Sequence, residues 1–243
     1  MSEILLRADS VCKNFGGIAA NDNISLRVAK GDIVGLIGPN GSGKSTLFNL
    51  ICGATPADGG GVYFAGRDIT SMSSAQIARA GLVRTFQQTR VYRGMTCMDN
   101  MRISAPGADW LRPPPPRLDA EAMELLSFVG LETKRAQAAG SLSFGQQKLL
   151  ELAMALIARP TMLLLDEPTA GINPTLINGV LARLKTVNET FGITLLVIEH
   201  NMRVIMNLAR HIYCLAHGRL LAEGGAAEIQ NDPRVIDAYL GKR

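Results

Sequence analysis

A glycine-rich segment in the first quarter of the chain could bind phosphate. Residues 38–45 read GPNGSGKS and fit the pattern G-x-x-x-x-G-K-[ST]. Glycines let backbone N–H groups converge on a polyphosphate, and the helix expected next adds its positive N-terminal end. Lys44 can reach the β- and γ-phosphates, and Ser45 can ligate Mg²⁺. The pattern predicts a nucleoside triphosphate site that comprises Gly38, Pro39, Asn40, Gly41, Ser42, Gly43, Lys44, Ser45 and Thr46.

A second candidate for chemistry is a pair of adjacent carboxylates, Asp166 and Glu167, which follow the apolar residues 162–165. Ligands bind at the carboxyl ends of the strands of a parallel sheet, so Asp166 is expected beside the phosphate loop, holding Mg²⁺ through water. Glu167 would then face the γ-phosphate, where it could orient and deprotonate an attacking water. The alternative is a strand that simply ends in solvent, where acids are common. The phosphate loop upstream favours the site.

The composition limits the class of protein. The 243 residues are 47% apolar and 19% charged, which excludes general disorder and leaves ample length for a hydrophobic core. The net charge of +4 is too small and too dispersed to indicate nucleic-acid binding. No apolar run approaches the length of a membrane span, and the first residues lack the pattern of a secretion signal. The four cysteines are far apart, which predicts reduced thiols in a cytosolic protein.

Alternating and continuous apolar runs predict the elements that position these residues. Residues 91–158 read mostly as helix and loop, with Pro113–Pro116 in a loop and with Asp119 and Ser143 as helix N-caps. Pro174 and Asn201 are expected to begin two later helices. The expected strands cover residues 4–11, 24–28, 32–37, 62–65, 161–165, 194–198, 211–215 and 219–222. The expected helices cover residues 45–52, 119–129 and 143–158, followed by those that begin at 174 and 201.

This order of elements predicts an α/β fold. Strands and helices alternate before and after the helical middle, which favours a parallel-sheet core with an inserted helical subdomain. With the phosphate loop, we expect this core to be of the P-loop NTPase type, with an N-terminal antiparallel β part. We expect one domain over residues 1–243. Its nucleotide-binding core would comprise residues 1–89 and 159–243, and its helical subdomain residues 90–158.

Several motifs together resemble those of ABC-type ATPases. Residues 142–147 read LSFGQQ and resemble the LSGGQ signature, at the expected place between the phosphate loop and the acidic strand end. Gln87 resembles the Q-loop glutamine, residues 170–174 the D-loop, and His200 the switch histidine. Phe15 stands where the family places an aromatic residue that stacks on adenine. The resemblance covers essentially the whole chain.

Within that family, the chain resembles the ATP-binding subunits of bacterial branched-chain amino-acid importers. The similarity lies in residues 35–41, in RTFQ at 84–87, in 198–202 and in the tail from Asn231 to Gly241. RTFQ favours the first of the two paralogous ATPase subunits. Phe144 departs from the general signature, where a glycine is usual.

The resemblance implies that ATP with Mg²⁺ is bound and hydrolysed to drive transport. Two such subunits, identical or paralogous, would stack head to tail, with ATP between the phosphate loop of one and the signature of the other. Implied partners are transmembrane permease subunits and, indirectly, a periplasmic solute-binding protein, at the cytoplasmic side of the bacterial inner membrane; nucleic acid is not expected. The implied roles are catalysis by Glu167, His200 and Gln87, metal binding by Ser45, Gln87 and Asp166, and contact with the partner's ATP by Ser143, Phe144, Gly145 and Gln146.

Other functions remain open at this point. An exporter for lipid or lipopolysaccharide, or an importer for urea or amides, would carry a similar cassette. A module that senses ATP without turnover is disfavoured by intact Glu167 and His200, and a GTPase or kinase would leave the signature unexplained. The methionine-rich residues 91–101 suit either core packing or a groove for a permease helix. The Pro113–Pro116 run suits either a stiff surface loop or a partner ligand.

Overall fold

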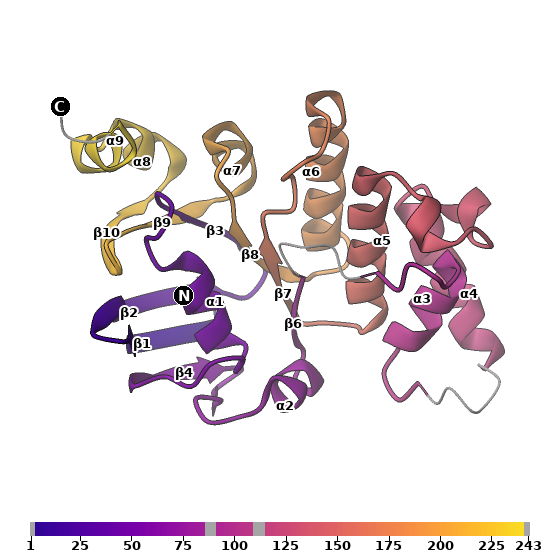
Figure 1. Cartoon of the computed structure of the whole chain (residues 1–243), viewed down its shortest axis with the longest axis horizontal. Helices are drawn as coiled ribbons and strands as arrows, with labels where there is room; N and C mark the ends of the chain where they lie inside the picture. Colours follow the sequence, from indigo (N-terminus) through magenta and orange to yellow (C-terminus); the bar gives the residue numbers. More distant parts are fainter. Residues whose placement is uncertain (1–2, 86–90, 109–114, 241–243) are drawn as a thin grey trace.

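The computed structural model describes residues 3–85, 91–108 and 115–240, and within them two β-sheets. One sheet has the order β2-β1-β4-β5, and the other has the order β10-β9-β3-β8-β7-β6. In Figure 1 the first sheet lies beside α1, and α6 and α5 stand between the second sheet and the small helices α3 and α4. The first sheet consists of β1 (Ile4–Phe15), β2 (Ile18–Ala29), β4 (Gly59–Phe64) and β5 (Arg67–Asp68). The second consists of β3 (Ile33–Ile37), β6 (Leu82–Arg84), β7 (Met162–Asp166), β8 (Thr194–Ile198), β9 (His211–Ala216) and β10 (Arg219–Gly224).

The centre of the second sheet is parallel and covered on both faces. Strands β3, β7 and β8 pair in parallel, and every residue in them is buried. Because successive side chains of a strand point to opposite faces, they divide between two cores. Leu164 and Leu196 pack in the core with α1 (Lys44–Ile51) and the first sheet. Leu163 and Leu195 pack in the core with α6 (Pro174–Glu189) and α7 (Met202–Leu208).

The middle of the chain forms a helical unit with a core of its own. This third core joins α3 (Cys97–Ser104), α4 (Pro116–Phe128) and one side of α5 (Phe144–Ile157). It also contains Leu131, just before the short 3-10 helix Glu132–Lys134, and Ala139 of the 3-10 helix Ala139–Ser141. The other side of α5 packs in the core with α6. Cys97 and Met101 are fully buried here, as the core-packing alternative for residues 91–101 predicts. The boundary of the helical subdomain stays a prediction.

One predicted helix start was wrong. Helix α4 begins at Pro116, after Pro115 as N-cap, and Asp119 lies in its first turn. Proline suits the first helical position because its φ is already helical and its missing N–H would have no partner there. Asp119 instead accepts two hydrogen bonds from the Arg102 guanidinium, at 2.8 and 2.7 Å. Pro116 is therefore helical rather than part of a loop, and Pro113 and Pro114 lie outside the described residues.

Most other predicted elements are confirmed. Ser143 and Asn201 are the N-caps of α5 and α7, and Pro174 is the first residue of α6. The hairpin of β9 and β10 turns at His217 and Gly218. Strands β5 and β6 and the helices α2 (Ser74–Arg79), α8 (Ala226–Asn231) and α9 (Pro233–Leu240) were not predicted. In the described part of the chain, no helix combines the length and apolar character needed to cross a membrane.

Candidate functional site

The phosphate loop connects the carboxyl end of β3 to the start of α1. Two of its glycines have backbone conformations and neighbours that exclude a side chain. Gly38 has φ +147°, and a Cβ there would lie 2.2 Å from the carbonyl oxygen of Leu215. Gly43 has φ +100°, and its Cβ would lie 2.3 Å from the carbonyl oxygen of Ala20. The loop can therefore take this tight path only with glycine at both positions.

The Lys44 side chain hydrogen-bonds to the first two residues of the loop. Its Nζ donates hydrogen bonds to the carbonyl oxygens of Gly38 at 2.7 Å and Pro39 at 2.9 Å. Burial lowers the pKa of the Lys44 ammonium, and the nearby carboxylates Glu167 and Asp166 partly offset that effect. Phosphate oxygens would stabilise the charged ammonium better than carbonyl dipoles do, so Lys44 is poised to exchange these partners for an anion.

An open hollow of about 450 Å³ brings the predicted residues of three elements together. It combines the loop and the first turn of α1 with Glu167, which follows β7, and His200, which comes two residues after β8. These residues meet because the carboxyl ends of parallel strands lie at the same edge of a sheet. Its lining residues are Ala20, Asn40, Gly41, Ser42, Gly43, Lys44, Ser45, Thr46, Glu167 and His200.

Glu167 and His200 contact each other across this edge. The Nε2 atom of His200 lies 2.6 Å from Oε1 of Glu167. Glu167 has φ +51°, a left-handed conformation that is strained for a residue other than glycine, and its N–H donates to the carbonyl oxygen of Ile198 at 3.0 Å. The backbone bond to β8 holds this conformation and directs the carboxylate toward the hollow.

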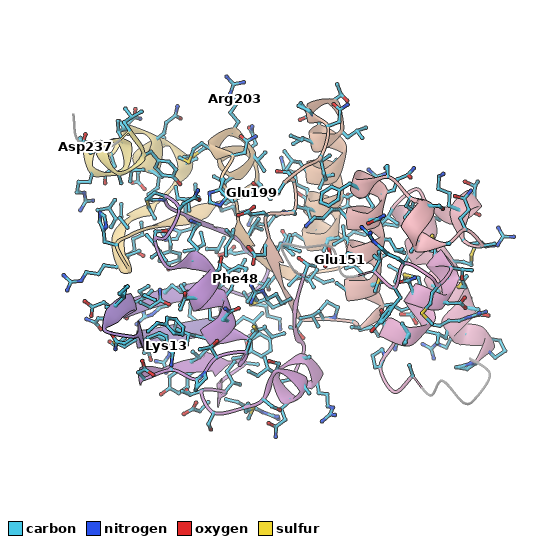
Figure 2. The ribbon with its side chains drawn as sticks, in the orientation of Figure 1. Lys13, Phe48, Glu151, Glu199, Arg203 and Asp237 are labelled. Carbon is cyan, nitrogen blue, oxygen red and sulfur yellow. The ribbon has the colours of Figure 1, made fainter. Side chains whose placement is uncertain are left out.

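A buried carboxylate that the sequence analysis missed joins the same two loops. Glu199, labelled in Figure 2, directly follows β8 and is 3% exposed. Its Oε1 accepts hydrogen bonds from the N–H of Thr169 at 2.9 Å and from the Thr169 hydroxyl at 2.6 Å. These bonds join the segment after Glu167 to the residue before His200, so they position both hollow-lining side chains relative to each other.

Asp166 forms a buried ion pair that the sequence analysis also missed. Its Oδ2 accepts a hydrogen bond at 2.7 Å from Nη2 of Arg84, at the end of β6. Nη1 of Arg84 donates to the side-chain oxygen of Asn49 on α1 at 2.5 Å. Oδ1 of Asp166 is buried and has no hydrogen-bond partner within the described residues. One oxygen of this carboxylate therefore remains to accept from a ligand.

Removing Arg84 should destabilise the fold strongly. Arg84→Ala would leave the Asp166 carboxylate buried without its cation, which lowers the free energy of unfolding by about 3–5 kcal/mol. Urea unfolding monitored by circular dichroism measures this change. The control is Arg159→Ala, which breaks the exposed pair with Glu121 and should leave the free energy of unfolding nearly unchanged. Equal stability of the two variants would contradict the importance of the buried pair.

Asp166 is not among the residues that line the hollow, but its chemistry and that of Ser45 fit Mg²⁺. The ion prefers oxygen ligands, and the unpaired Oδ1 of Asp166 and the hydroxyl-bearing Ser45 of the hollow supply that chemistry. In residues 3–85, 91–108 and 115–240, no cluster of three His, Cys, Asp or Glu side chains could hold a metal ion alone. A metal at this place therefore needs further oxygens from a ligand such as phosphate. Gln87 lies outside the described residues.

The signature residues lie apart from the hollow of the same chain. Ser143 Oγ accepts from the N–H of Gln146 at 3.3 Å, and Gln146 Oε1 accepts from the N–H of Ser143 at 3.1 Å, which forms a capping box at the start of α5. Phe144 is 46% exposed, and a Cβ on Gly171 would lie 2.8 Å from its ring. None of Ser143, Phe144, Gly145 and Gln146 is among the residues that line the hollow.

Phe15 also lies outside the lining of the hollow. It is the last residue of β1, its side chain is half exposed, and Nζ of Lys13 lies 5.5 Å from the centre of its ring. An exposed aromatic face of this kind can stack on a planar ligand.

Comparisons with known proteins show the family of the chain. A family model described as ABC transporter matches residues 21–170, and one described as branched-chain amino acid ATP-binding cassette transporter matches residues 219–243. The probable branched-chain amino acid transport ATP-binding protein LivG of Methanocaldococcus jannaschii is 38% identical, over 98% of each chain. The high-affinity branched-chain amino acid transport ATP-binding protein BraF of Pseudomonas aeruginosa is 35% identical, over 100% of each chain.

Solved structures show the same likeness. The ADP conformation of MJ1267, an ATP-binding cassette of an ABC transporter, superposes with a TM-score of 0.91 at 36% identity, over 99% of this chain and 100% of that one. A dimeric post-hydrolysis state of the cassette MJ0796 bound to ADP and Pi has a TM-score of 0.81 at 25% identity, over 91% of this chain and 99% of that one. Since relatives at these identities match it nearly end to end, the chain belongs to the ATP-binding proteins of ABC transporters, a family of ATPases.

Proposed function

We propose that this chain is the ATP-hydrolysing subunit of an ABC importer for branched-chain amino acids. The observation that carries the proposal is the full-length similarity to relatives named as branched-chain amino acid transport ATP-binding proteins, together with a C-terminal match to the family model of that name. In this role ATP hydrolysis would power a separate permease.

The proposed ATP lies in the open hollow with its phosphates on the loop. Backbone N–H groups of the loop and of the first turn of α1 would bind the phosphates, and Lys44 would turn from the carbonyl groups of Gly38 and Pro39 to the phosphate oxygens. Phe15 would stack on the adenine. The lining of the hollow supports this placement of the phosphates.

Glu167 is the proposed general base. Its carboxylate would take a proton from water as the water oxygen bonds to the γ-phosphorus and the bond to the bridging oxygen breaks, which leaves ADP and phosphate. His200 would hold both the carboxylate and the γ-phosphate, which its 2.6 Å contact with Glu167 supports. Gln87 is the third proposed catalytic residue, by resemblance alone.

We propose Ser45, Gln87 and Asp166 as the residues that hold Mg²⁺, with Asp166 acting through water. When bound together with ATP, the ion would neutralise charge that develops on the phosphates. The unpaired Oδ1 of Asp166 supports this assignment. The proposed ligands that lie within the described residues belong to α1 and β7, so nucleotide binding would connect these two elements.

A second ATPase subunit is proposed to complete the site. The signature residues 143–146 are absent from the lining of the hollow, so a partner would supply them. The N–H groups at the start of α5 could then bind the γ-phosphate of the other subunit's ATP. The dimeric structure of MJ0796 bound to ADP and Pi supports such an arrangement.

Permease subunits and a periplasmic solute-binding protein are the further proposed partners. The chain would lie against the cytoplasmic side of a bacterial inner membrane, held there by the permease. The exposed part of residues 91–101, which includes Tyr92, is the proposed docking site for a permease helix.

Reconstitution tests the proposed substrate. The chain is incorporated into vesicles with the permease subunits and solute-binding protein that co-purify with it, and phosphate release, solute uptake and lipid movement are measured with each solute. Leucine, isoleucine or valine should stimulate ATP hydrolysis, whereas urea and short amides should not. Stimulation by urea or an amide alone would contradict branched-chain amino acids as the substrate. Outward movement of lipid would contradict the proposal that the complex is an importer.

A further inference from the structure

The C-terminal helix α9 reaches the phosphate loop. The N–H of Gly38, the first residue of the loop, donates a hydrogen bond of 2.8 Å to the hydroxyl oxygen of Tyr239, which lies 201 residues later in the chain. Tyr239 is in the last turn of α9. A residue near the end of the described chain thus contacts the point where β3 becomes the loop.

The backbone of Gly38 has two side-chain partners: the Tyr239 hydroxyl on its N–H and the Lys44 ammonium on its carbonyl oxygen. The carbonyl oxygen of Gly38 accepts from Nζ of Lys44 at 2.7 Å. In the proposed ATP complex Lys44 turns to the phosphates, which releases that carbonyl. The Tyr239 hydroxyl would remain on the N–H and would keep Gly38 close to Leu215, whose carbonyl oxygen lies 2.2 Å from the place of a Cβ on Gly38.

The packing of α9 against the core fixes the position of the Tyr239 hydroxyl. Val235 is buried in the core that also contains Ile37, and the Tyr239 ring packs against the same core. Burial raises the pKa of Tyr239 to about 12, so the hydroxyl stays protonated at neutral pH. Elsewhere on α9, Ile236 is 42% and Leu240 81% exposed. Among the described residues, Val235 and Tyr239 are thus the side chains by which this helix joins that core.

We propose that Tyr239 is a positioning residue for ATP binding, and that α9 docking and ATP binding stabilise each other through Gly38. A loop whose donors already converge loses less conformational freedom when a phosphate binds, so it binds more tightly. Because coupling between two equilibria is reciprocal, bound ATP also strengthens the docking of α9. This inference rests on the proposal that the loop binds ATP. It assigns a task to the C-terminal segment that the second family model matches.

Tyr239→Phe tests the proposal because it removes the hydroxyl and keeps the ring. Titration calorimetry with ATP and Mg²⁺ on the full chain should show a Kd raised about five- to tenfold, since the buried N–H of Gly38 loses its acceptor. The rate of hydrolysis at saturating ATP should change less than about twofold, because Tyr239 touches no reacting group. Hydrogen exchange of residues 233–240 should slow when ATP binds to the native chain, and slow much less in the variant.

Two further variants show whether a negative result concerns Tyr239 or the proposed ATP site. Leu240→Ala, on the exposed face of the same helix, should keep the native Kd. Lys44→Ala tests the loop itself, and an unchanged Kd there would overturn the proposed ATP site. If Lys44→Ala weakens binding while Tyr239→Phe keeps the native Kd, the ATP site stands and the inference about Tyr239 is overturned. A folded Tyr239→Phe chain that has lower stability but a native Kd would likewise overturn it, since Tyr239 would then only pack the tail.

Discussion

Glu167→Gln should slow ATP hydrolysis by about 10²- to 10⁴-fold, the usual contribution of a general base. Glutamine has nearly the same shape as glutamate, and its side-chain oxygen can still accept from Nε2 of His200, 2.6 Å away in the native contact. It cannot take a proton from water at neutral pH. ATP should therefore still bind, and the ATP-driven dimer should persist because its release depends on hydrolysis.

Single-turnover phosphate release measures the chemical step, and size-exclusion chromatography with ATP and Mg²⁺ measures the dimer. Glu223→Gln is the matched control, because Glu223 is a half-exposed glutamate on β10, away from the hollow. That variant should hydrolyse ATP at the native rate. Undiminished turnover in Glu167→Gln would show that Glu167 is not the general base. His200 would then be the next candidate for that role.

Lys44→Ala should weaken ATP binding about 10- to 100-fold, the range expected when a charge-assisted hydrogen bond to an anion is lost. The native ammonium is already buried in the loop and bonded to the carbonyl oxygens of Gly38 and Pro39. Burial lowers the pKa of the ammonium because it disfavours the charged form, and a phosphate oxygen that accepts from it would stabilise that charge. The same change removes the donor from both carbonyl groups, so some loss of stability accompanies the loss of affinity.

Titration calorimetry gives the affinity, and a thermal melt shows that the variant is folded at the temperature used. The control is Lys30→Ala, because the Lys30 ammonium forms an exposed pair with Glu3. This variant should bind ATP with the native Kd. A native Kd in Lys44→Ala would contradict the assignment of residues 38–45 as the phosphate site.

Features that depend on neighbours in the chain were predicted well. The buried strands β3, β7 and β8 follow from continuous apolar runs, and the caps Ser143 and Asn201 follow from side chains that bond to N–H groups two or three residues later. The confirmed family follows from motifs of the same local kind. The error at α4 is local too: four prolines predicted a loop, but Pro116 is at the one helical position that suits proline.

Three contacts between distant segments, which hold the site residues in place, were not predicted. Arg84 meets Asp166 across 82 residues, Glu199 meets Thr169 across 30, and Tyr239 meets Gly38 across 201. Nothing in the local pattern around these residues names a partner, because the partner is chosen by the order of strands in the sheet and by the packing of α9. The short strand β6 had too few residues to show a period, so the position of Arg84 could not be inferred either.

The sequence alone therefore determined which groups are available for chemistry: the phosphate loop, the two carboxylates at the end of β7, the histidine after β8 and the capped signature helix. Each of these features depends on bonds between residues that are a few positions apart. The residue types and their spacing are therefore enough to predict it. The tertiary structure decided how these groups are held, since it brings Arg84 to Asp166, Glu199 to Thr169 and Tyr239 to Gly38. The physical reason is that side chains far apart in the chain become neighbours only when strands pair and helices pack, and buried polar groups must then find partners among whatever that packing brings near.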